Sequence, residues 1–362
     1  MKKNQRSRKQ IEKDLPVKEL LAWYLENRRD LPWRGQKTPY AVWVSEIMLQ
    51  QTRIETVRGY FLRFMQAFPT VRDLAKAPLD DVLKLWEGLG YYSRARNLKT
   101  AAEQVVFRGH FPDSSGEWSR LPGIGPYTAA ALASICNGEP APVVDGNVGR
   151  VVARFRAAPL DPKNPKTRAS IADWLRPAIE ASHAPGDFNE AMMELGETIC
   201  LPSSPSCPLC PFRKNCRSFL QGETSRYPAK TAPRTRPVRH FIALIVQSGP
   251  GRFFLHHRPE HGLLGGLWEV PSVESAPSPT RAAVFKSAED IGIKAPTWNP
   301  AGEIIHDFTH FRQILHVWLA APGAQTKTIK TYIFANPENL ALSTASKRAL
   351  ELVKRKIVSR TS

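Results

Sequence analysis

Long apolar runs and secretory features are missing from this chain of 362 residues. No apolar stretch approaches the roughly 20 residues that a membrane-spanning helix needs. The opening MKKNQRSRKQ is basic, but it continues into IEKD instead of the apolar core of a secretory signal. We therefore expect a cytoplasmic protein in a reducing compartment, where disulfides are rare.

Acidic residues are also scarce relative to basic ones: 33 Asp and Glu stand against 51 Lys and Arg, which gives a formal net charge of +18. Each phosphate that a basic side chain neutralises releases counterions and adds affinity, so this balance favours a polyanionic partner. A merely soluble basic protein has the same composition. The apolar fraction of 42% is ample for buried cores, and the length favours two domains.

Helical periodicity dominates from Pro16 to about Cys200, where segments such as LPVKELLAWYLENRR and DFNEAMMELGETIC are separated by cap and turn residues. Thr38 before Pro39 and Thr70 before the next helical run are expected N-caps. No strand alternation interrupts this stretch. The pattern predicts an all-α domain.

The pattern changes after the cysteine-rich segment. We expect the helical domain over residues 1–222 and an extended basic linker, rich in Pro, Arg and Thr, over residues 223–238. Beyond it, HFIALIV, GRFFLHHR and ILHVWLA are typical of strands, and TRAAVFKSAEDI and SKRALELVKRK are typical of helices. The second domain, over residues 239–362, is therefore predicted to be α+β.

Four of the five cysteines are crowded into one short segment with the spacing C-x6-C-x2-C-x5-C, namely Cys200, Cys207, Cys210 and Cys216. In a reducing compartment such crowding indicates a metal centre. Structural zinc sites usually pair two C-x2-C knuckles, and only one is present here, whereas a 4Fe-4S cluster also takes four cysteines with uneven spacing. Both metals stay open at this point. Cys136, in the apolar run AALASIC, is expected to be a buried hydrophobic residue.

The segment LPGIGPYTAAALASI predicts a helix-hairpin-helix over about residues 114–135. A turn of this kind exposes backbone N–H groups at a helix N-terminus, where the unpaired donors and the helix dipole suit a phosphate. We expect the backbone of Gly123, Ile124 and Gly125 to contact DNA, with Pro126 opening the second helix. A plain helix C-cap accounts for one glycine but not for both.

Two carboxylates are candidates for an acid–base pair. Asp145, in PVVDGNVGRVVARF, precedes a helix, where it is either a simple N-cap or an ionised group that stabilises a cationic sugar. Glu46, in VWVSEIMLQ, is either a solvated helix residue or a desolvated acid with a raised pKa. An acid and an ionised partner are the pair that cleaves glycosides, including the bond between a base and its sugar.

The hairpin, the aspartate after it and the four-cysteine spacing together resemble the helix-hairpin-helix glycosylase superfamily, over approximately residues 20–216. Endonuclease III-like enzymes and MutY-type adenine DNA glycosylases share all three features. Endonuclease III-like enzymes carry a Schiff-base lysine at the position of Tyr127, and a tyrosine cannot form that intermediate. The motifs LPWR, SEIMLQQT, GLGYYSRARNL and VDGNV are also similar to those of the MutY type.

This resemblance implies a role for individual residues. Glu46 is expected to protonate the adenine ring and Asp145 to stabilise the oxocarbenium centre, while Tyr127 and Asn147 support the intermediate and the water. It also implies contacts to the opposite base and a wedge into the base stack by Gln51, Thr52, Leu89 and Tyr91. Since the adjacent tyrosines of GLGYY cannot both face one core, one is expected to meet DNA. The basic residues after it either track phosphate or form a solvated face: Arg94, Arg96 and Lys99.

The C-terminal half resembles the Nudix-like domain of MutY-type enzymes. Its box is broken, because FKSAEDIGI keeps Glu289, Asp290 and Gly292 but has Phe285 and Lys286 in place of the Arg-Glu pair. We therefore expect a recognition module without nucleotide hydrolysis.

One loop of this domain is a candidate for lesion recognition. The triplet Phe308, Thr309 and His310 falls where the family has a Phe-Ser-His loop that touches 8-oxoguanine, and threonine keeps the hydroxyl. Without the resemblance, His310 would be interpreted as a core histidine.

The resemblance thus implies a monofunctional glycosylase that removes adenine opposite 8-oxoguanine or guanine. Its implied cofactor is a 4Fe-4S cluster, and its partners are duplex DNA and other base-excision repair proteins. A monomer held at the bacterial nucleoid through DNA is expected. The alternatives are a glycosylase with lyase activity on oxidised pyrimidines, a lesion-binding protein without catalysis, and a nucleotide-diphosphate hydrolase.

Overall fold

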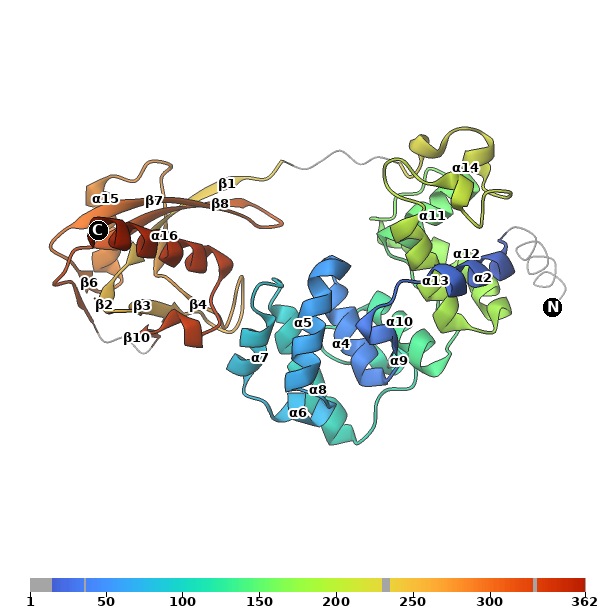
Figure 1. Ribbon diagram of the computed structural model, residues 1–362, viewed down its shortest axis with the longest axis horizontal. Coiled ribbons are helices and arrows are strands. Elements are labelled where there is room, and N and C mark those ends of the chain that lie inside the picture. The colour runs from blue at the N-terminus through green and yellow to red at the C-terminus, as the bar shows by residue number, and fades with distance from the viewer. Residues whose placement is uncertain (1–14, 36, 230–234, 328–330, 362) are drawn as a thin grey trace. The chain divides into compact units, whose positions relative to one another are not determined.

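The computed structural model describes residues 15–35, 37–229, 235–327 and 331–361. The chain divides into two compact units: residues 1–76 with 97–232 form a helical unit, and residues 77–96 with 233–362 form a mixed unit (Figure 1). The basic N-terminal segment and the centre of the expected linker, residues 230–234, lie outside the described residues. None of the described helices combines the length and apolar composition that a bilayer crossing demands.

The helical unit contains helices of varied length joined by short turns. Its helices are α2 (Val17–Asn27), α3 (Pro32–Gly35), α4 (Pro39–Leu49), α5 (Ile54–Ala67), α6 (Val71–Lys76), α8 (Ser93–Arg108), α9 (Ser115–Trp118), α10 (Pro126–Asn137), α11 (Gly146–Arg156), α12 (Pro165–Ser182), α13 (Pro185–Thr198) and α14 (Arg217–Leu220), with 3-10 turns at Cys207–Leu209 and Thr224–Arg226.

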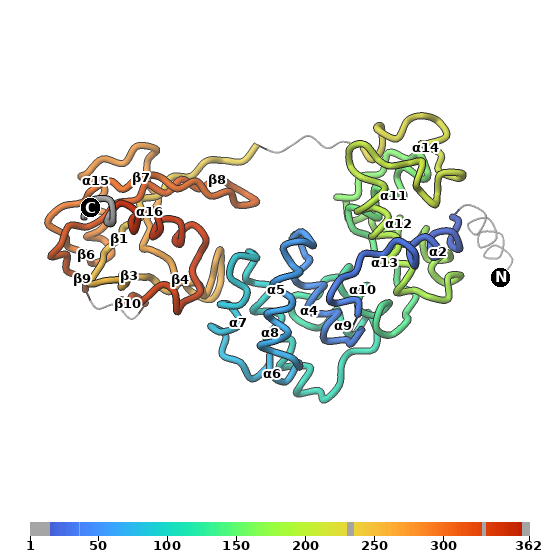
Figure 2. Tube along the Cα trace, viewed as in Figure 1, coloured from blue at the N-terminus to red at the C-terminus, as the bar shows by residue number. Residues whose placement is uncertain are grey.

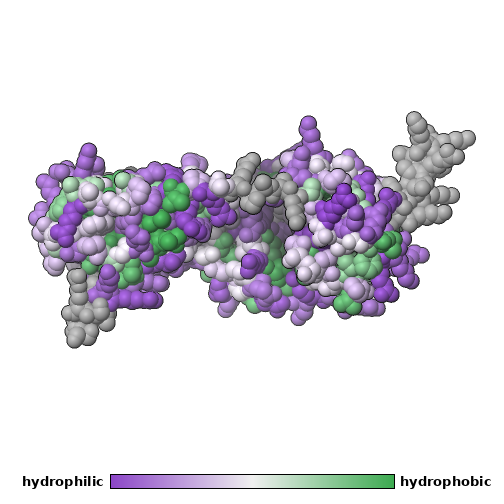
Figure 3. Space-filling view, turned by 90° about the horizontal axis from the view of Figure 1, so that it is seen from above, coloured by the Kyte–Doolittle hydropathy of each residue, from purple (hydrophilic) through white to green (hydrophobic). Residues whose placement is uncertain are grey.

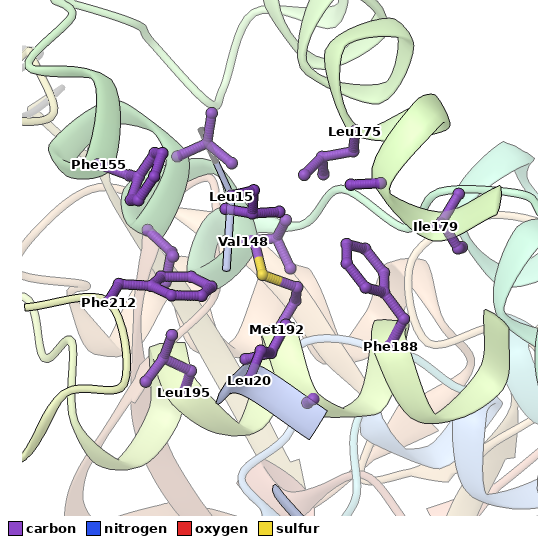
Figure 4. Close-up of a cluster of buried hydrophobic side chains, with 14 of the residues drawn as sticks. Leu15, Leu20, Val148, Phe155, Leu175, Ile179, Phe188, Met192, Leu195 and Phe212 are labelled. Carbon is purple, nitrogen blue, oxygen red and sulfur yellow. The ribbon is translucent and has the colours of Figure 1, made fainter. Parts of the chain in front are cut away.

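The apolar faces of α2, α11, α12 and α13 meet in one core of this unit (Figure 4). Figure 2 shows α2, at the blue end of the colour scale, beside α12 and α13, which follow more than a hundred residues later. Leu20, Val148 and Phe188 are fully buried there. Burial of such side chains stabilises the fold by about 1.5–3 kcal/mol each. This core fixes the N-terminal end of α11 against α13.

The predicted N-caps are confirmed. The Thr38 hydroxyl accepts a hydrogen bond from the Ala41 N–H at 3.2 Å, and Pro39 opens α4. Thr70 and Asp73 cap α6 reciprocally, with the Thr70 N–H donating to the Asp73 carboxylate at 3.0 Å and the Asp73 N–H donating to the Thr70 hydroxyl at 3.3 Å. Local sequence therefore determines where these helices begin.

The predicted hairpin is present as α9, a tight turn and α10. Gly123 has a φ of 77°, a backbone conformation that favours glycine, and a Cβ there would lie 2.7 Å from the Asn97 Cβ. Gly125 is the N-cap residue of α10 and has no side chain to satisfy the first N–H groups of the helix. The turn thus leaves backbone donors of the kind that bind phosphate.

The mixed unit is built around a four-stranded sheet in the order β5-β1-β8-β7. β1 and β8 run parallel, with Phe241 opposite Leu315, and the other pairs of this sheet are antiparallel. A second sheet has the order β10-β3-β2, with β4 paired to β3, and β6 pairs with β9. The strands and helices are α7 (Leu79–Trp86), β1 (Val238–Ile245), β2 (Gln247–Gly249), β3 (Arg252–His257), β4 (Trp268–Glu269), β5 (Ser272–Ser275), α15 (Arg281–Asp290), β6 (Ile293–Lys294), β7 (Trp298–Asp307), β8 (Arg312–Ala320), β9 (Gln325–Thr326), β10 (Tyr332–Ala335), a 3-10 turn at Pro337–Asn339 and α16 (Thr344–Thr361).

Two cores cover the two faces of the larger sheet. Ala243, Ile245 and Leu315 pack with residues of α16 on one face, and Ile242 and Leu244 pack with residues of α15 on the other. The alternation along β1 is the pattern of a strand with a core on each side. Hydrophilic residues cover much of the visible surface (Figure 3). The predicted fold class, an all-α domain followed by an α+β domain, is confirmed.

The mixed unit also includes residues 77–96, which the sequence prediction assigned to the helical domain. The reason is a set of polar contacts: the Lys84 ammonium donates to the Leu340 carbonyl at 2.7 Å, and the Glu87 carboxylate accepts from the Leu342 N–H at 2.8 Å. Lys347 pairs with Glu87 at 2.7 Å. Sequence periodicity does not reveal contacts between residues so far apart.

Replacement of Thr38 by alanine should destabilise the helical unit by about 1 kcal/mol, because the Ala41 N–H loses its acceptor. The measurement is guanidinium unfolding followed by far-ultraviolet circular dichroism. Thr100→Ala, at an exposed position inside α8, should leave the midpoint unchanged or slightly higher. Equal midpoints for wild type and Thr38→Ala would contradict the capping role.

Candidate active site

A cleft of about 1370 Å³ lies in the helical unit. Its lining comes from α4, the hairpin, the N-terminus of α11 and one face of α13. The four residues expected to carry catalysis all line it: Glu46, Tyr127, Asp145 and Asn147. The fold thus brings together side chains that are as far apart in the sequence as Glu46 and Asn147.

Glu46 is a buried acid. It lies on α4, which is buried from Tyr40 to Met48, and only 8% of Glu46 is exposed. Burial, and to a lesser extent the nearby Glu190 and Asp145 carboxylates, raise the pKa of its carboxyl to about 8, against the opposing Arg34. The predicted raised pKa has the predicted cause, namely desolvation. Near neutral pH this group therefore carries a proton.

Asp145 is the N-cap of α11. Its carboxylate accepts a hydrogen bond from the Val148 N–H at 2.7 Å. The sequence predicted that the helix terminus would keep this group ionised, but burial raises its pKa, and the backbone N–H groups of Val148 and Asn147 only partly oppose that rise. Desolvation outweighs the helix terminus in the free protein. A cation beside Asp145 would favour its ionised form.

Tyr127 and Asn147 are held by neighbours on α13. The hydroxyl of the half-buried Tyr127 donates to the Met193 sulfur at 3.1 Å, and desolvation raises the pKa of this phenol well above its usual value. Asn147 donates to Glu197 at 3.4 Å. Gly196 permits α13 to approach Asn147 closely, because a Cβ at position 196 would lie 2.7 Å from the Asn147 Cβ. Both side chains thus depend on close packing of α13 against α10 and α11.

Sequence reasoning missed a network of ion pairs in the same cleft. Arg29 pairs with Glu194 at 2.6 Å and with Glu197 at 2.5 Å. Arg34 pairs with Glu194 at 2.9 Å and with Glu190 at 3.3 Å. Glu194 is only 1% exposed, and although burial raises its pKa, the hydrogen bonds from the two arginines lower it overall. These pairs keep Glu194 charged in the same cleft as the protonated Glu46.

The signal for this network is present in the sequence. Asp187, Glu190, Glu194 and Glu197 follow one another at helical spacing along α13. Acids at three- and four-residue intervals share one face of a helix, and here that face is next to apolar residues. The basic run ENRRDLPWR supplies the arginines.

The residues expected to contact the opposite base lie in both units. Gln51 and Thr52 line the cleft, and Gln51 has a φ of 57°, which is unusual for a residue other than glycine. Leu89 belongs to the mixed unit and is 5% exposed. Tyr91, in the same unit, is 43% exposed and has a φ of 48°. Strained backbone of this kind often marks functional loops.

The two adjacent tyrosines face opposite ways, as predicted. Tyr92 is 4% exposed and packs inside, whereas Tyr91 is open to solvent. Arg94 neither lies on a solvated face nor is free to track phosphate, because it is 8% exposed and donates to the carbonyls of Leu89 and Gly90 at 3.1 Å. Burial lowers the pKa of Arg94 to about 10. Arg94 supports the loop that presents Tyr91.

The candidate lesion loop joins β7 to β8. The Phe308 ring stacks on Phe311 with centroids 4.7 Å apart, whereas Thr309 and His310 are exposed. The interpretation of His310 as a core histidine is therefore wrong: it lies at a loop tip, outside the packed layers. The Thr309 hydroxyl forms a hydrogen bond with the Tyr91 hydroxyl inside the mixed unit. The structure thus brings together two residues that were predicted separately.

The four clustered cysteines line one pocket beside α11, together with Phe155 and Phe212. Among the described residues, no group of three or more His, Cys, Asp or Glu side chains is arranged to hold a single metal ion. Burial raises the pKa of the Cys210 thiol to about 12, and a bound metal ion would favour its thiolate form. Four sulfur donors around one pocket suit an iron–sulfur cluster. Cys136 stays outside this set, and burial raises its pKa to about 12.

Arg150 connects this cysteine pocket to the cleft. Its guanidinium donates to the Asn147 side-chain oxygen at 2.9 Å, to the Gly196 carbonyl at 2.7 Å and to the Cys200 carbonyl at 2.7 Å. The cleft residue and the first cysteine are therefore held by one planar group. Because the arginine fork has fixed geometry, movement of the cysteine loop would be transmitted to Asn147.

The two acidic residues that this chain keeps from the Nudix box lie on α15. Glu289 and Asp290 are exposed at its end, and Phe285 is 40% exposed. No described group of acids converges on a metal site there.

Two family models match this chain: the model of HhH-GPD superfamily base excision DNA repair proteins over residues 44–177, and the NUDIX domain model over residues 242–352. The adenine DNA glycosylase of Arabidopsis thaliana is 41% identical, over 83% of this chain and 56% of its own length. That of Rattus norvegicus is 36% identical, over 92% of this chain and 77% of its own length. A solved thermostable thymine-DNA glycosylase is 27% identical, with a TM-score of 0.52, over 60% of this chain and 99% of that one.

The helical fold, the hairpin beside an acidic cleft and these matches define a helix-hairpin-helix DNA glycosylase with an appended Nudix domain. Such enzymes hydrolyse an N-glycosidic bond. Within this class, the chain belongs to the adenine DNA glycosylases. The predicted resemblance is confirmed. The chain spans little more than half of the Arabidopsis relative, so its own activity, substrates and partners are matters for proposal.

Replacement of Glu46 by glutamine should change how stability depends on pH. The raised pKa means that the folded state binds the proton more tightly than the unfolded state, so this contribution to stability is complete below pH 4.5 and is lost as the pH rises through about 8. The melting temperature of wild type should therefore fall relative to Glu46→Gln between about pH 5 and about pH 9. The exposed Glu26→Gln serves as the control. Parallel pH profiles for wild type and Glu46→Gln would contradict the raised pKa.

Proposed function

We propose that this chain is a monofunctional glycosylase that flips adenine out of a mispair with 8-oxoguanine or guanine and hydrolyses its N-glycosidic bond. The observation that carries the proposal is the pairing of a protonated Glu46 with Asp145 in one cleft. Glycoside cleavage needs an acid for the leaving group and a carboxylate for the cationic sugar.

In the proposed reaction, Glu46 donates its proton to the adenine ring, and the bond between the base and C1′ breaks with its electrons going to the base. The positive charge that develops at C1′ and the ring oxygen is stabilised by the Asp145 carboxylate. Water then adds to C1′ and its proton passes to a carboxylate. Asn147 and Tyr127 orient the water and the sugar.

The ion-pair network supports the protonation state that this step needs. Two arginines compensate Glu194, so they are not available to neutralise Glu46. The Glu190 carboxylate raises the pKa of Glu46, as burial does. Glu46 thus carries a proton near neutral pH, although Arg34 partly opposes the rise in its pKa.

Tyr127 supports a hydrolytic outcome without strand cleavage. A lyase needs an amine that displaces the base at C1′ and then forms a Schiff base there as the C1′–O bond of the sugar ring opens. Tyr127 supplies a phenol whose pKa burial raises well above its usual value, so it carries its proton. The lyase alternative therefore lacks its nucleophile at this position.

Duplex DNA is the proposed partner. The net charge of +18 and the exposed backbone donors of the hairpin, at Gly123, Ile124 and Gly125, suit a phosphate backbone. Gln51, Thr52 and Leu89 are proposed to contact the opposite base and its stack. Other repair proteins as partners, a monomeric state and a cytoplasmic, nucleoid-associated location stay predictions.

The mixed unit is proposed to recognise 8-oxoguanine through Phe308, Thr309 and His310, with Tyr91 entering the base stack. The support is the hydrogen bond between the hydroxyls of Tyr91 and Thr309, which joins the Tyr91 loop to the loop between β7 and β8. The broken Nudix box disfavours nucleotide hydrolysis.

We further propose that Cys200, Cys207, Cys210 and Cys216 hold a 4Fe-4S cluster. The supporting observation is that all four sulfur donors line one pocket. The cluster would join the cysteine loop to α11 and supply structural cross-linking, as iron–sulfur centres bound by four cysteines do.

Asp145→Asn should abolish adenine release, since a neutral amide cannot stabilise the cationic sugar, while duplex binding is retained. A single-turnover assay with adenine opposite 8-oxoguanine measures release, and gel shift measures binding. Asp173→Asn, whose side chain is 77% exposed, should behave as wild type. Release at the wild-type rate by Asp145→Asn would refute the mechanism.

The substrate assignment is tested with duplexes that bear adenine opposite 8-oxoguanine, guanine and cytosine in turn. Excision should be fastest opposite 8-oxoguanine and slowest opposite cytosine. Borohydride should trap no covalent adduct, because Tyr127 forms no Schiff base. A trapped adduct on oxidised pyrimidine would instead support the lyase alternative.

The cluster proposal is tested on protein purified without oxygen. About four iron and four sulfide per chain are expected for a 4Fe-4S cluster. Replacement of Cys207 by serine should lower both contents, whereas Cys136→Ser should not. Zinc in place of iron would overturn the cluster assignment.

A further inference from the structure

Arg154 is a buried cation without a carboxylate partner. It lies on α11, the helix that begins at Asp145, and only 2% of it is exposed. Among the ion pairs between described residues, no Asp or Glu contacts it. A buried charge is costly unless other groups compensate it. The fold must therefore provide that compensation in another form.

The guanidinium instead donates to one sulfur and to backbone oxygens on both sides of the cysteine segment. The acceptors are the Cys200 sulfur at 3.4 Å, Leu201 O at 2.6 Å, Pro202 O at 2.9 Å, Thr224 O at 3.1 Å and Tyr227 O at 3.0 Å. Two of these carbonyls directly follow the first cysteine, and two lie beyond the last. One side chain thus ties the beginning of the cysteine loop to its exit.

Four of the five acceptors are neutral carbonyls, and the fifth belongs to a proposed cluster ligand. Cys216, the last of the four, also lies close, with its sulfur 3.6 Å from the Arg154 carbonyl oxygen. A 4Fe-4S centre with four thiolates carries net negative charge in its usual oxidation states. We propose that Arg154 is the positioning residue and counter-ion of the cluster, joining its thiolate shell to both ends of the loop. This proposal rests on the cluster proposed above.

Neighbouring arginines on the same helix differ in what they contact. Arg150 donates to the Cys200 carbonyl, and none of its hydrogen bonds is to a sulfur. Arg156 is half-buried and stacks over Trp174, with its guanidinium carbon 5.2 Å from the ring centroid. Only Arg154 among the three has a guanidinium within hydrogen-bond distance of a cysteine sulfur. Arg156 is therefore a matched control.

Two substitutions distinguish the contribution of the positive charge of Arg154 from that of its hydrogen-bond geometry. Lysine at position 154 would keep the positive charge but lose the planar fork, whereas glutamine would lose both the charge and most donors. Hydrogen bonds and positive charge near the sulfurs favour the reduced, more negative cluster. The reduction potential should therefore fall in the order wild type, Arg154→Lys, Arg154→Gln.

The experiment compares the full chain as wild type, Arg154→Lys, Arg154→Gln and Arg156→Gln. Iron and sulfide per chain, the rate of visible bleaching by a chelator, and the reduction potential by protein-film voltammetry are measured. Arg154→Gln should bleach about 10–100-fold faster than wild type, as removal of a partner of a metal ligand typically does. Arg154→Lys should be intermediate, and Arg156→Gln should match wild type.

The outcomes distinguish this proposal from the one on which it rests. Wild type without iron would refute the cluster itself. Iron in wild type, with the same bleaching rate and potential in Arg154→Gln, would overturn the role of Arg154 alone. Equal losses in Arg154→Lys and Arg154→Gln would overturn the counter-ion part, because the retained charge would then have no effect.

Discussion

The chemistry of the cleft depends on the different electrostatic environments of the carboxylates buried in it. Glu194 is compensated by two arginines and stays charged, whereas Glu46 is left without a strong cationic partner and takes up a proton. Desolvation raises the pKa of both groups, but two arginines lower the pKa of Glu194, whereas neighbouring carboxylates add to the rise for Glu46. Glu46 is therefore a proton donor near neutral pH. Any change that freed Arg29 or Arg34 to approach Glu46 would favour its carboxylate form and remove this proton donor.

α11 connects this cleft to the proposed cluster. Its first turn is capped by Asp145, its middle carries Arg150, and its last turn carries Arg154. Because a helix is stiff along its axis, the position of the cysteine loop constrains the position of the carboxylate at the other end. Structural and catalytic roles are thus arranged along one element, which gives the cysteine loop a connection to the chemistry without its taking part in the reaction.

Motifs with local physical causes were predictable from sequence. The caps at Thr38 and Thr70, the hairpin with its glycines, and the change to strand periodicity all follow from neighbouring residues. The burial of Glu46 was predictable from its apolar flanks. The burial of Arg94 was not predictable, because it depends on packing under a loop. The assignment of residues 77–96 to the mixed unit was not predictable either, because it depends on contacts with residues distant in sequence.

By itself the sequence determined the two domains, the family and the set of chemically capable residues, since composition, periodicity and motif spacing are properties of the chain alone. Only the tertiary structure decided the charge states in the cleft. Burial raises the pKa of Asp145 against the pull of its helix terminus, and the acids of α13 meet arginines from a segment some 160 residues earlier. Desolvation and ion pairing depend on what surrounds a group in space, and that is known only when the chain is folded.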